Sequence, residues 1–251
     1  MTTRILLLAV LAAGSGRALA QQPEAPASQG TRLTRAQVLA AIERASEQSP
    51  ADLSGSDLSG LDLSGVDFKR ANLTRCRLVG TNLSGARMFA VRLDDAVATG
   101  ANLTGTVLDV AWMRRIDLRH AVLREASLYA TLLSDANLAD ADLTHVRIIA
   151  AMRGAVLRGA KADSANFGAD PGNQPMGLMR TDATGADFTD VRFGGANLRK
   201  VNFTRANLTG ADLSAADMTG ADLAGAVLRS IRGRERIVGL DRTLHLDQAV
   251  Q

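Results

Sequence analysis

The sequence predicts an all-β solenoid, in which the chain winds into a rod of stacked coils. Three observations support this fold class. A five-residue word, first seen in ADLSGSDLSGLDLSGVDF between Ala51 and Phe68, recurs through most of the chain. Aromatic residues make up only 3% of the 251 residues, so a core must be assembled from many small and similar pieces. Two positions of each word are largely apolar or small, while the others favour Asp, Asn, Ser, Thr and Gly.

The first twenty residues, 1–20, read as a secretory signal peptide. Arg4 precedes an apolar stretch from Ile5 to Ala13, and the sequence ALA before Gln21 matches an A-x-A cleavage site. We therefore expect export, to a bacterial periplasm, with cleavage before Gln21. A membrane anchor is the alternative, but an apolar stretch of about nine residues is shorter than the ~20 that a spanning helix needs. We expect no stable membrane insertion.

Residues 21–33 and 34–50 join the signal peptide to the repeats. The first segment begins QQPEAPASQG, is polar with two prolines, and is typical of a flexible linker. Thr34 and Gln37 make a capping-box pattern at the start of a helix over 34–50, which Pro50 is expected to end. The helix has one apolar stripe, which predicts that it caps the open end of the solenoid.

The central residue of each word, called its centre, lies five residues after the previous one. Twenty consecutive centres run from Leu53 to Ile148, and only Ala98 among them is small. Residues two apart on an extended segment face the same side, so the centre and the residue two before it point inward together. The next inward residue comes three later, which requires a bend where Gly, Asn or Asp is favoured. A chain that bends alike every five residues must wind, and its turns can stack through backbone hydrogen bonds.

Words such as ANLTG and ADMTG resemble the A(D/N)LxG motif of the pentapeptide-repeat family. The resemblance covers residues 51–230 and implies a right-handed, four-sided parallel β-helix with four words per coil. The frame shortens by one residue after Ile148 and is interrupted by GADPGNQPMG, which predicts a loop near 169–176 before centres resume at Leu178. The 35 words then amount to about nine coils. Residues 231–251 are expected to form a C-terminal cap.

No residue pattern points to catalysis, a cofactor or a metal. The aspartates of the first words belong to the repeat, Cys76 occupies an inward position, and His120, His145 and His245 share no ligand spacing. We therefore expect a protein that is not an enzyme and has no cofactor, metal or small-molecule substrate. The enzymatic alternative would place a site in the loop, where Asp170 is the only acid.

Charge argues against nucleic acid as a partner. The chain has 29 Lys and Arg against 26 Asp and Glu, and no basic run stands out. Arg114, Arg115, Arg119 and Arg124 fall within one coil, and we interpret them as ordinary solvated surface rather than a basic belt. Some members of the family that this sequence resembles protect DNA gyrase by mimicking DNA. Export and a near-neutral surface make that function the less favoured alternative.

One edge of the coil is predicted to carry an apolar interaction patch. With four words per coil, residues twenty apart stack, and the columns around one corner contain apolar side chains that the word does not require. They are Phe89, Val110, Trp112, Tyr129, Leu132 and Ile149. Three occupants stay open: the protein's own loop or tail, a second copy, and a foreign protein. We expect a rigid interaction or scaffold module, with a structural protein lacking a specific partner as the alternative.

Overall fold

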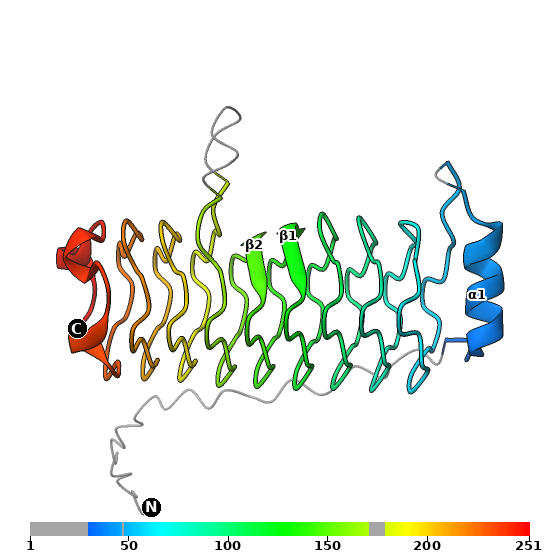
Figure 1. Ribbon diagram of the computed structural model, residues 1–251, viewed down its shortest axis with the longest axis horizontal. Helices are drawn as coiled ribbons and strands as arrows, with labels where there is room; N and C mark the ends of the chain where they lie inside the picture. The colour runs from blue at the N-terminus through cyan, green and yellow to red at the C-terminus, as the bar shows by residue number, and fades with distance from the viewer. Residues whose placement is uncertain (1–29, 47, 171–178) are drawn as a thin grey trace, which may run out of the picture.

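The computed structural model describes residues 30–46, 48–170 and 179–251, which form a straight rod of stacked coils with a helix at one end (Figure 1). Its regular elements are α1 (Arg35–Arg44), β1 (Ser127–Leu132), β2 (Arg147–Ala151), η2 (Arg234–Arg236), η3 (Leu240–Arg242) and η4 (Leu246–Gln248). Elsewhere single parallel bridges join the coils. The low helix content and the parallel stacking fit the predicted β-helix solenoid.

Each coil takes twenty residues over most of the rod. Parallel bridges join Asp52 to Asn72 and Asn72 to Arg92, a step of four five-residue words each time. Leu53 N–H donates to the Asn72 carbonyl at 2.9 Å, and Asn72 N–H donates to the Ala51 carbonyl at 2.8 Å. Neighbouring coils thus satisfy each other's backbone polar groups, which is what holds a solenoid together.

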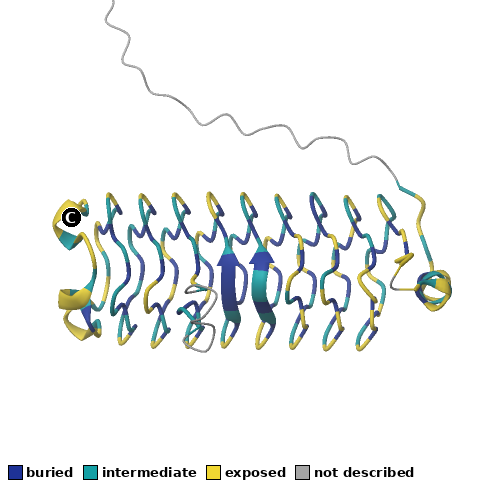
Figure 2. Ribbon diagram, turned by 90° about the horizontal axis from the view of Figure 1, so that it is seen from above, coloured by how far each residue is buried: buried dark blue, intermediate teal, exposed yellow. Residues whose placement is uncertain are grey.

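Centres and the residues two before them fill the interior, which confirms the predicted inward frame (Figure 2). Leu103 and Leu123 are 2% and 0% exposed. In the C-terminal half phenylalanine replaces leucine at several centres, and the ring centroids of Phe188 and Phe193 lie 5.5 Å apart. The centre predicted at Leu178 lies outside the described residues.

Polar residues two before a centre are accommodated by one repeated hydrogen bond. The Thr106 hydroxyl is fully buried and donates to the Leu83 carbonyl, 23 residues earlier, at 3.0 Å. The thiol of Cys76 makes the equivalent contact, with Sγ 2.8 Å from the Leu53 carbonyl oxygen. The same contact is made by Thr81, Thr131 and Thr181. A hydroxyl or thiol is therefore tolerated in the core because it always meets an acceptor.

Each word turns at the residue two after its centre, which has a positive φ. Gly105 has φ +63°, and nothing lies within 4 Å of where a Cβ would be. Larger residues adopt the same conformation, such as Arg75 at +58° and Ala90 at +53°. Where the space outside a corner is open, as at Gly105, a side chain costs only the left-handed strain of about 1 kcal/mol, whereas a Cβ at Gly154 would meet the Asp135 carboxylate. This tolerance explains why corners vary in sequence.

α1 begins at the predicted capping box and closes one end of the rod. The Thr34 hydroxyl accepts a hydrogen bond from Gln37 N–H at 3.3 Å, and the Gln37 side chain accepts one from Thr34 N–H at 2.8 Å. Val38 and Ile42 are buried and join the contiguous core of the coils. The helix therefore shields apolar surface that the first coil would otherwise expose.

α1 is shorter than the predicted helix over 34–50 and ends at Arg44. Ser46 N–H donates to the Ser49 carbonyl at 3.0 Å, and Ser49 N–H donates to the Ser46 carbonyl at 3.2 Å. This turn uses backbone groups that a continuing helix would need, so the helix stops well before Pro50.

The predicted flexible linker over 21–33 is wrong in its last residues. Arg32 forms a parallel bridge with Asp57, and Leu33 N–H donates to the Asp57 carbonyl at 3.0 Å. This short stretch pairs with the first coil because its backbone groups reach the edge that the coil leaves open. Residues 1–29, including the predicted signal peptide, lie outside the described ranges. Within those ranges no helix is long and apolar enough to cross a membrane.

The shortened word after Ile148 removes one corner. β1 and β2 pair in parallel, and their register shifts at Ala130, which has no partner residue in β2. This coil takes nineteen residues, since Asn137 bridges Val156. The interruption follows one coil later, where Asp170 N–H donates to the Met179 carbonyl at 2.9 Å. Most of the loop predicted near 169–176 lies outside the described residues.

The C-terminal segment is a further coil built from six-residue words. IRGRER, IVGLDR and TLHLDQ follow one another from Ile231. Val238 and Leu244, which lie six apart, each bridge to the coil below. Gly239 and His245 have φ values of +70° and +56°, and each precedes a 3₁₀ turn, η3 or η4. The extra residue of each word is absorbed in that turn, so the winding continues to the end.

Candidate interaction surface

One corner of the coil carries the predicted patch. The stack of these corners along the rod is irregular at both of its ends. We call Arg70, Ala90, Val110 and Ala130, which stack twenty residues apart, the corner column. The column is entered from α1 at Pro50 and continues beyond the shortened coil at Ala169, whose N–H donates to the Arg199 carbonyl of the next coil. In Figure 1 the segment after α1 and the ends of the interruption rise from the same side of the rod. The corner column therefore lies between two projections.

The half of the column nearer α1 is bare and apolar. Phe89 is 52% exposed, Trp112 39% and Val110 38%. Phe89 and Trp112 flank successive corners of the column, and Val110 is itself a corner residue. Because bridged residues lie twenty apart, these three side chains belong to neighbouring coils at one edge.

Trp112 is held between charged neighbours. The guanidinium carbon of Arg92, from the coil before, lies 4.8 Å from the centroid of the Trp112 ring, and that of Arg114 lies 5.4 Å from it. Cation–π contacts of this kind fix the ring while leaving part of it exposed to solvent. The indole is therefore a preorganised contact group rather than a mobile side chain.

The other half of the patch is covered by the protein itself. Tyr129 is half-buried, its hydroxyl lies 3.4 Å from the Met179 sulfur, and the Arg147 guanidinium lies 4.5 Å from its ring centroid. Arg147 also pairs with Asp170 at 3.7 Å. The two ends of the interruption are thus anchored on Tyr129.

Ile149, a member of the predicted patch, is not exposed, as expected if the protein covers this part of the patch itself. It is only 2% exposed although it is not part of the contiguous core, so it is covered from outside the coil. β2 crosses this edge without a corner residue, so the chain does not turn outward next to Ile149. Leu132, which bridges Trp112, is half-buried and borders the bare half.

The first coil opens the corner column beside α1. Lys69 and Arg70 have φ values of +45° and +63°, whereas at the other described corners only the second residue is positive. Ala90 N–H donates to the Asp109 carbonyl at 2.9 Å, but Arg70, within the described coils, makes no such bond to Phe89. At this corner the backbone of the first coil is therefore not hydrogen-bonded to the next coil.

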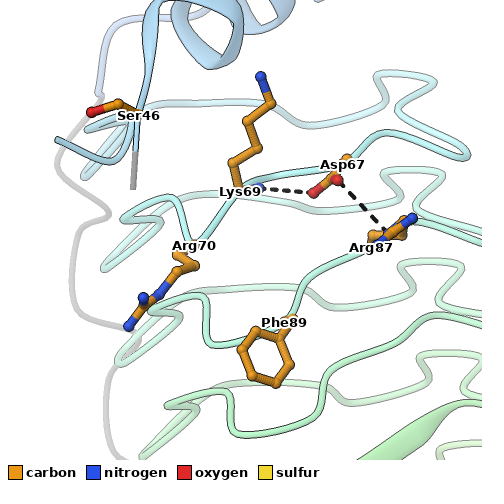
Figure 3. A pocket seen from close by; sticks show the side chains of 6 residues that line it. All are labelled: Ser46, Asp67, Lys69, Arg70, Arg87 and Phe89. Carbon is orange, nitrogen blue, oxygen red and sulfur yellow. Dashed lines mark hydrogen bonds and ion pairs between the residues drawn. The ribbon is translucent and has the colours of Figure 1, made fainter. Parts of the chain in front are cut away.

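Two hollows adjoin this opened corner. The larger, of about 530 Å³, is lined by Ser46, Asp67, Lys69, Arg70, Arg87 and Phe89 (Figure 3). In Figure 3 Lys69 extends toward α1, and Phe89 lies on the next coil. The second hollow, of about 370 Å³, is lined by Pro50, Asp52, Arg70, Asn72, Ala90 and Arg92. Arg70 lines both hollows, so the bare half of the column is concave beside this residue.

The cations of this edge fall into two groups according to whether a carboxylate pairs with them. Arg114 donates to Asp94 at 2.8 Å, and this hydrogen bond holds the pKa of the Asp94 carboxyl below its usual range. In contrast, no described carboxylate lies within 4.0 Å of the charged groups of Lys69, Arg70 or Arg92. Three cations that have no ion-pair partner among the described residues therefore lie on this edge, together with the Asp67 and Asp52 carboxylates that line the two hollows.

The four arginines considered as a basic belt are all neutralised. Arg114, Arg115, Arg119 and Arg124 pair with Asp94, Asp95, Asp117 and Asp142 at 2.6 to 2.8 Å. Each pair is exposed or partly exposed, so it contributes little stability. This pairing is consistent with the interpretation of the four arginines as ordinary solvated surface.

The aspartates of the first words have a structural role. Asp52 and Asp57 each accept a hydrogen bond from the backbone N–H two residues on, at 3.1 and 2.9 Å. Hydrogen bonds from the side chain and backbone of Ser54 lower the pKa of Asp52. Such Asx turns fix the corner, so the local structure accounts for these carboxylates.

The local structure also accounts for the other candidate reactive residues, which are one cysteine and three histidines. Burial raises the pKa of the Cys76 thiol to about 12, so it is not a nucleophile at neutral pH. His120 and His145 occupy exposed corners with φ +58°, and His245 hydrogen-bonds Asp222 at 2.8 Å. Among the described residues no group of three His, Cys, Asp or Glu could hold a metal ion.

The chain belongs to the pentapeptide-repeat family. The family model for pentapeptide repeats matches in eight copies, over residues 51–88, 111–148, 178–205 and 186–225. These matched ranges lie within residues 51–230, where the sequence resembles the family motif. The family fold is the right-handed β-helix solenoid that the stacked coils display.

Solved structures of other pentapeptide-repeat proteins are similar to this chain. HetL, involved in heterocyst differentiation regulation in the cyanobacterium Nostoc sp. strain PCC 7120, is 31% identical, with 72% of this chain and 84% of HetL covered and a TM-score of 0.36. A protein of the Arabidopsis thaliana thylakoid lumen is 31% identical over 41% of this chain and 73% of its own, with a TM-score of 0.38. QnrB1, a plasmid-mediated fluoroquinolone resistance protein, is 16% identical over 70% and 88%, with a TM-score of 0.43. No curated protein matches the chain.

Proposed function

We propose that this protein is a non-enzymatic, exported interaction module that presents a rigid binding edge. The repeats would form a four-sided β-helix of about nine coils, as 35 words at four per coil require, followed by the C-terminal coil. The observation that carries the proposal is the bare apolar edge of Phe89, Val110 and Trp112. The repeat does not need apolar side chains there, and exposed apolar patches usually serve contact with another molecule.

Rigidity supports binding as the role of this edge. Val110 N–H donates to the Tyr129 carbonyl at 2.7 Å, and Trp112 N–H donates to the Val91 carbonyl at 3.0 Å. The apolar groups are thus fixed to backbone that is bonded to the coils on both sides. A preorganised surface loses little entropy on association, which favours affinity.

The test is partner capture by a double variant of the bare edge. Phe89→Ser with Trp112→Ser should leave the circular dichroism spectrum intact and abolish capture of the proteins that the wild type retains from a periplasmic extract. Val107→Ser is the matched control, because Val107 is equally exposed, at 38%, on a different column. Unchanged capture by the double variant would contradict the proposal.

Self-association would use the same edge and is measured separately. Sedimentation velocity of the purified wild type and the double variant distinguishes a dimer formed through this edge from a monomer that needs a foreign partner. A dimer that persists in the double variant would place the self-contact elsewhere on the rod.

Export rests on the sequence of residues 1–20. A tagged full-length protein should appear in the periplasmic fraction of a bacterial host with Gln21 as its first residue, which mass spectrometry of the N-terminal peptide can show. Recovery of protein with an intact Met1 from the cytosol alone would contradict export.

A further inference from the structure

The geometry points to an extended acidic peptide segment of a partner protein as the occupant of the bare edge, an inference that rests on the function proposed above. The segment would lie along the corner column, across the coils, between the turn before the first coil and the covered Tyr129. Its carboxylates would meet Lys69, Arg70 and Arg92, and its apolar side chains would meet Phe89, Val110 and Trp112.

The dimensions of the edge fit a short extended segment. From the corner at Pro50 to that at Ala130 there are four coil spacings of about 4.8 Å, or about 19 Å, which an extended chain covers with roughly six residues. The two hollows beside Arg70 provide depth for side chains at one end. At the other end Met179 contacts Tyr129, and Arg147, which lies over the Tyr129 ring, pairs with Asp170. These contacts limit the length of the segment.

The cations of this edge outnumber its carboxylates, since the two hollows are lined by Lys69, Arg70, Arg87 and Arg92 but only by Asp67 and Asp52, and this balance favours an acidic segment. Lys69 and Arg70 are exposed side chains at the opened corner, and Arg92 lies one coil on. In the described part of the chain these three have no carboxylate within ion-pair distance, whereas Arg114 and Arg115 nearby already have Asp94 and Asp95. Carboxylates of a bound segment would therefore complete pairs that the protein leaves open on this edge.

The same groups fit a nucleic acid less well. Single-stranded nucleic acid is bound by stacking bases on aromatic faces along a groove of many cations. Two guanidinium groups already lie over the Trp112 ring, at 4.8 and 5.4 Å from its centroid. A base would have to displace one of them, and three unpaired cations are few for a phosphate backbone.

Trp112 provides a direct reporter, because it is the only tryptophan in the chain. A twelve-residue peptide of alternating Glu and Leu, titrated into the full chain, should change tryptophan fluorescence saturably. The matching peptide of alternating Gln and Leu should bind about tenfold more weakly, the loss expected for one or two charge pairs. Equal binding of the two peptides would overturn the inference.

Variants locate the site independently of the reporter. Arg70→Gln with Arg92→Gln should weaken binding of the Glu–Leu peptide about tenfold by calorimetry. Arg75→Gln with Arg205→Gln is the matched control, because both are exposed corner arginines with φ +58° and +56° away from the column. A control that weakens binding as much as the test variant would show a general charge effect and overturn the site.

Two further outcomes separate this inference from the proposed function. If a partner is lost in the Phe89→Ser, Trp112→Ser variant but is retained by the arginine variant, the edge binds a protein and the acidic chemistry is wrong. If an oligodeoxythymidylate probe binds more tightly than the Glu–Leu peptide, the edge takes nucleic acid and the inference is overturned.

Discussion

Truncation of one buried centre tests the physical basis of the fold. Leu103 is 2% exposed, and the centres stacked twenty residues before and after it, Leu83 and Leu123, are 1% and 0% exposed. Leu103→Ala would therefore leave a cavity enclosed along the stack by two large side chains.

The loss in free energy of unfolding depends on how far the neighbouring side chains can move in to close the cavity. Leu83 N–H donates to the Asn102 carbonyl and Leu103 N–H donates to the Val122 carbonyl, both at 2.7 Å. These bonds fix the spacing of the coils, so the neighbours cannot move in to fill the space. Because buried Leu→Ala changes cost about 2–5 kcal/mol according to relaxation, we expect the upper part, about 3–5 kcal/mol.

Urea unfolding measures this loss with two probes. Circular dichroism follows the whole rod, and Trp112 fluorescence follows the coils next to the cavity, which matters because solenoids can unfold locally. Ser84→Ala is the control. The backbone N–H of this outward residue donates to the Asn82 side chain, and the substitution keeps that hydrogen bond, so it should cost under about 0.5 kcal/mol. A loss below about 1 kcal/mol for Leu103→Ala, or equal losses for the two variants, would refute the inward frame.

Three further predictions concern polar groups. Thr106→Val should cost about 0.5–1.5 kcal/mol in the same urea assay, because it loses one hydrogen bond while the Leu83 carbonyl keeps the N–H of Ala86; a cost above about 3 kcal/mol would contradict this. Cys76 should resist iodoacetamide at pH 8 in the native protein and react in urea, since its pKa is about 12; fast native labelling, read by mass spectrometry, would show an exposed thiol. Asp52 and Asp94 have pKa values lowered on folding, so their stabilisation is present above the unfolded pKa and is lost as pH falls below about 4; thermal melts that strengthen on acidification would reverse the sign.

The sequence predicted the interior well because the five-residue phase is a local property. Steric limits on an extended pair of residues and a bend fix which side chains face inward, whatever the rest of the chain does. The same phase placed Phe89, Val110 and Trp112 on one edge once the coil length was taken as four words. The capping box at Thr34 was likewise readable, because its partners are three residues apart.

The sequence of the C-terminal coil carries a six-residue period, which the five-residue repeat does not predict. Gly233, Gly239 and His245 recur every six residues, and each has a positive φ followed by a 3₁₀ turn. The five-residue period does not fit this segment, so the repeat by itself predicts only a cap there. The ion pairs Asp94–Arg114 and Asp95–Arg115 were also accessible, since their members lie twenty residues apart, one coil length.

The sequence alone determined the coil, its inward residues and the corner on which apolar side chains collect, because each depends on a repeated local geometry. Only the tertiary structure decided which part of that edge is free. Tyr129 meets Met179, fifty residues later, and Ile149 is covered from outside, because of the path that the chain takes around the interruption. The end of α1 at Arg44 and the opened corner at Lys69 and Arg70 depend in the same way on particular contacts. No period constrains such contacts, so their outcome follows from long-range packing rather than from the repeat.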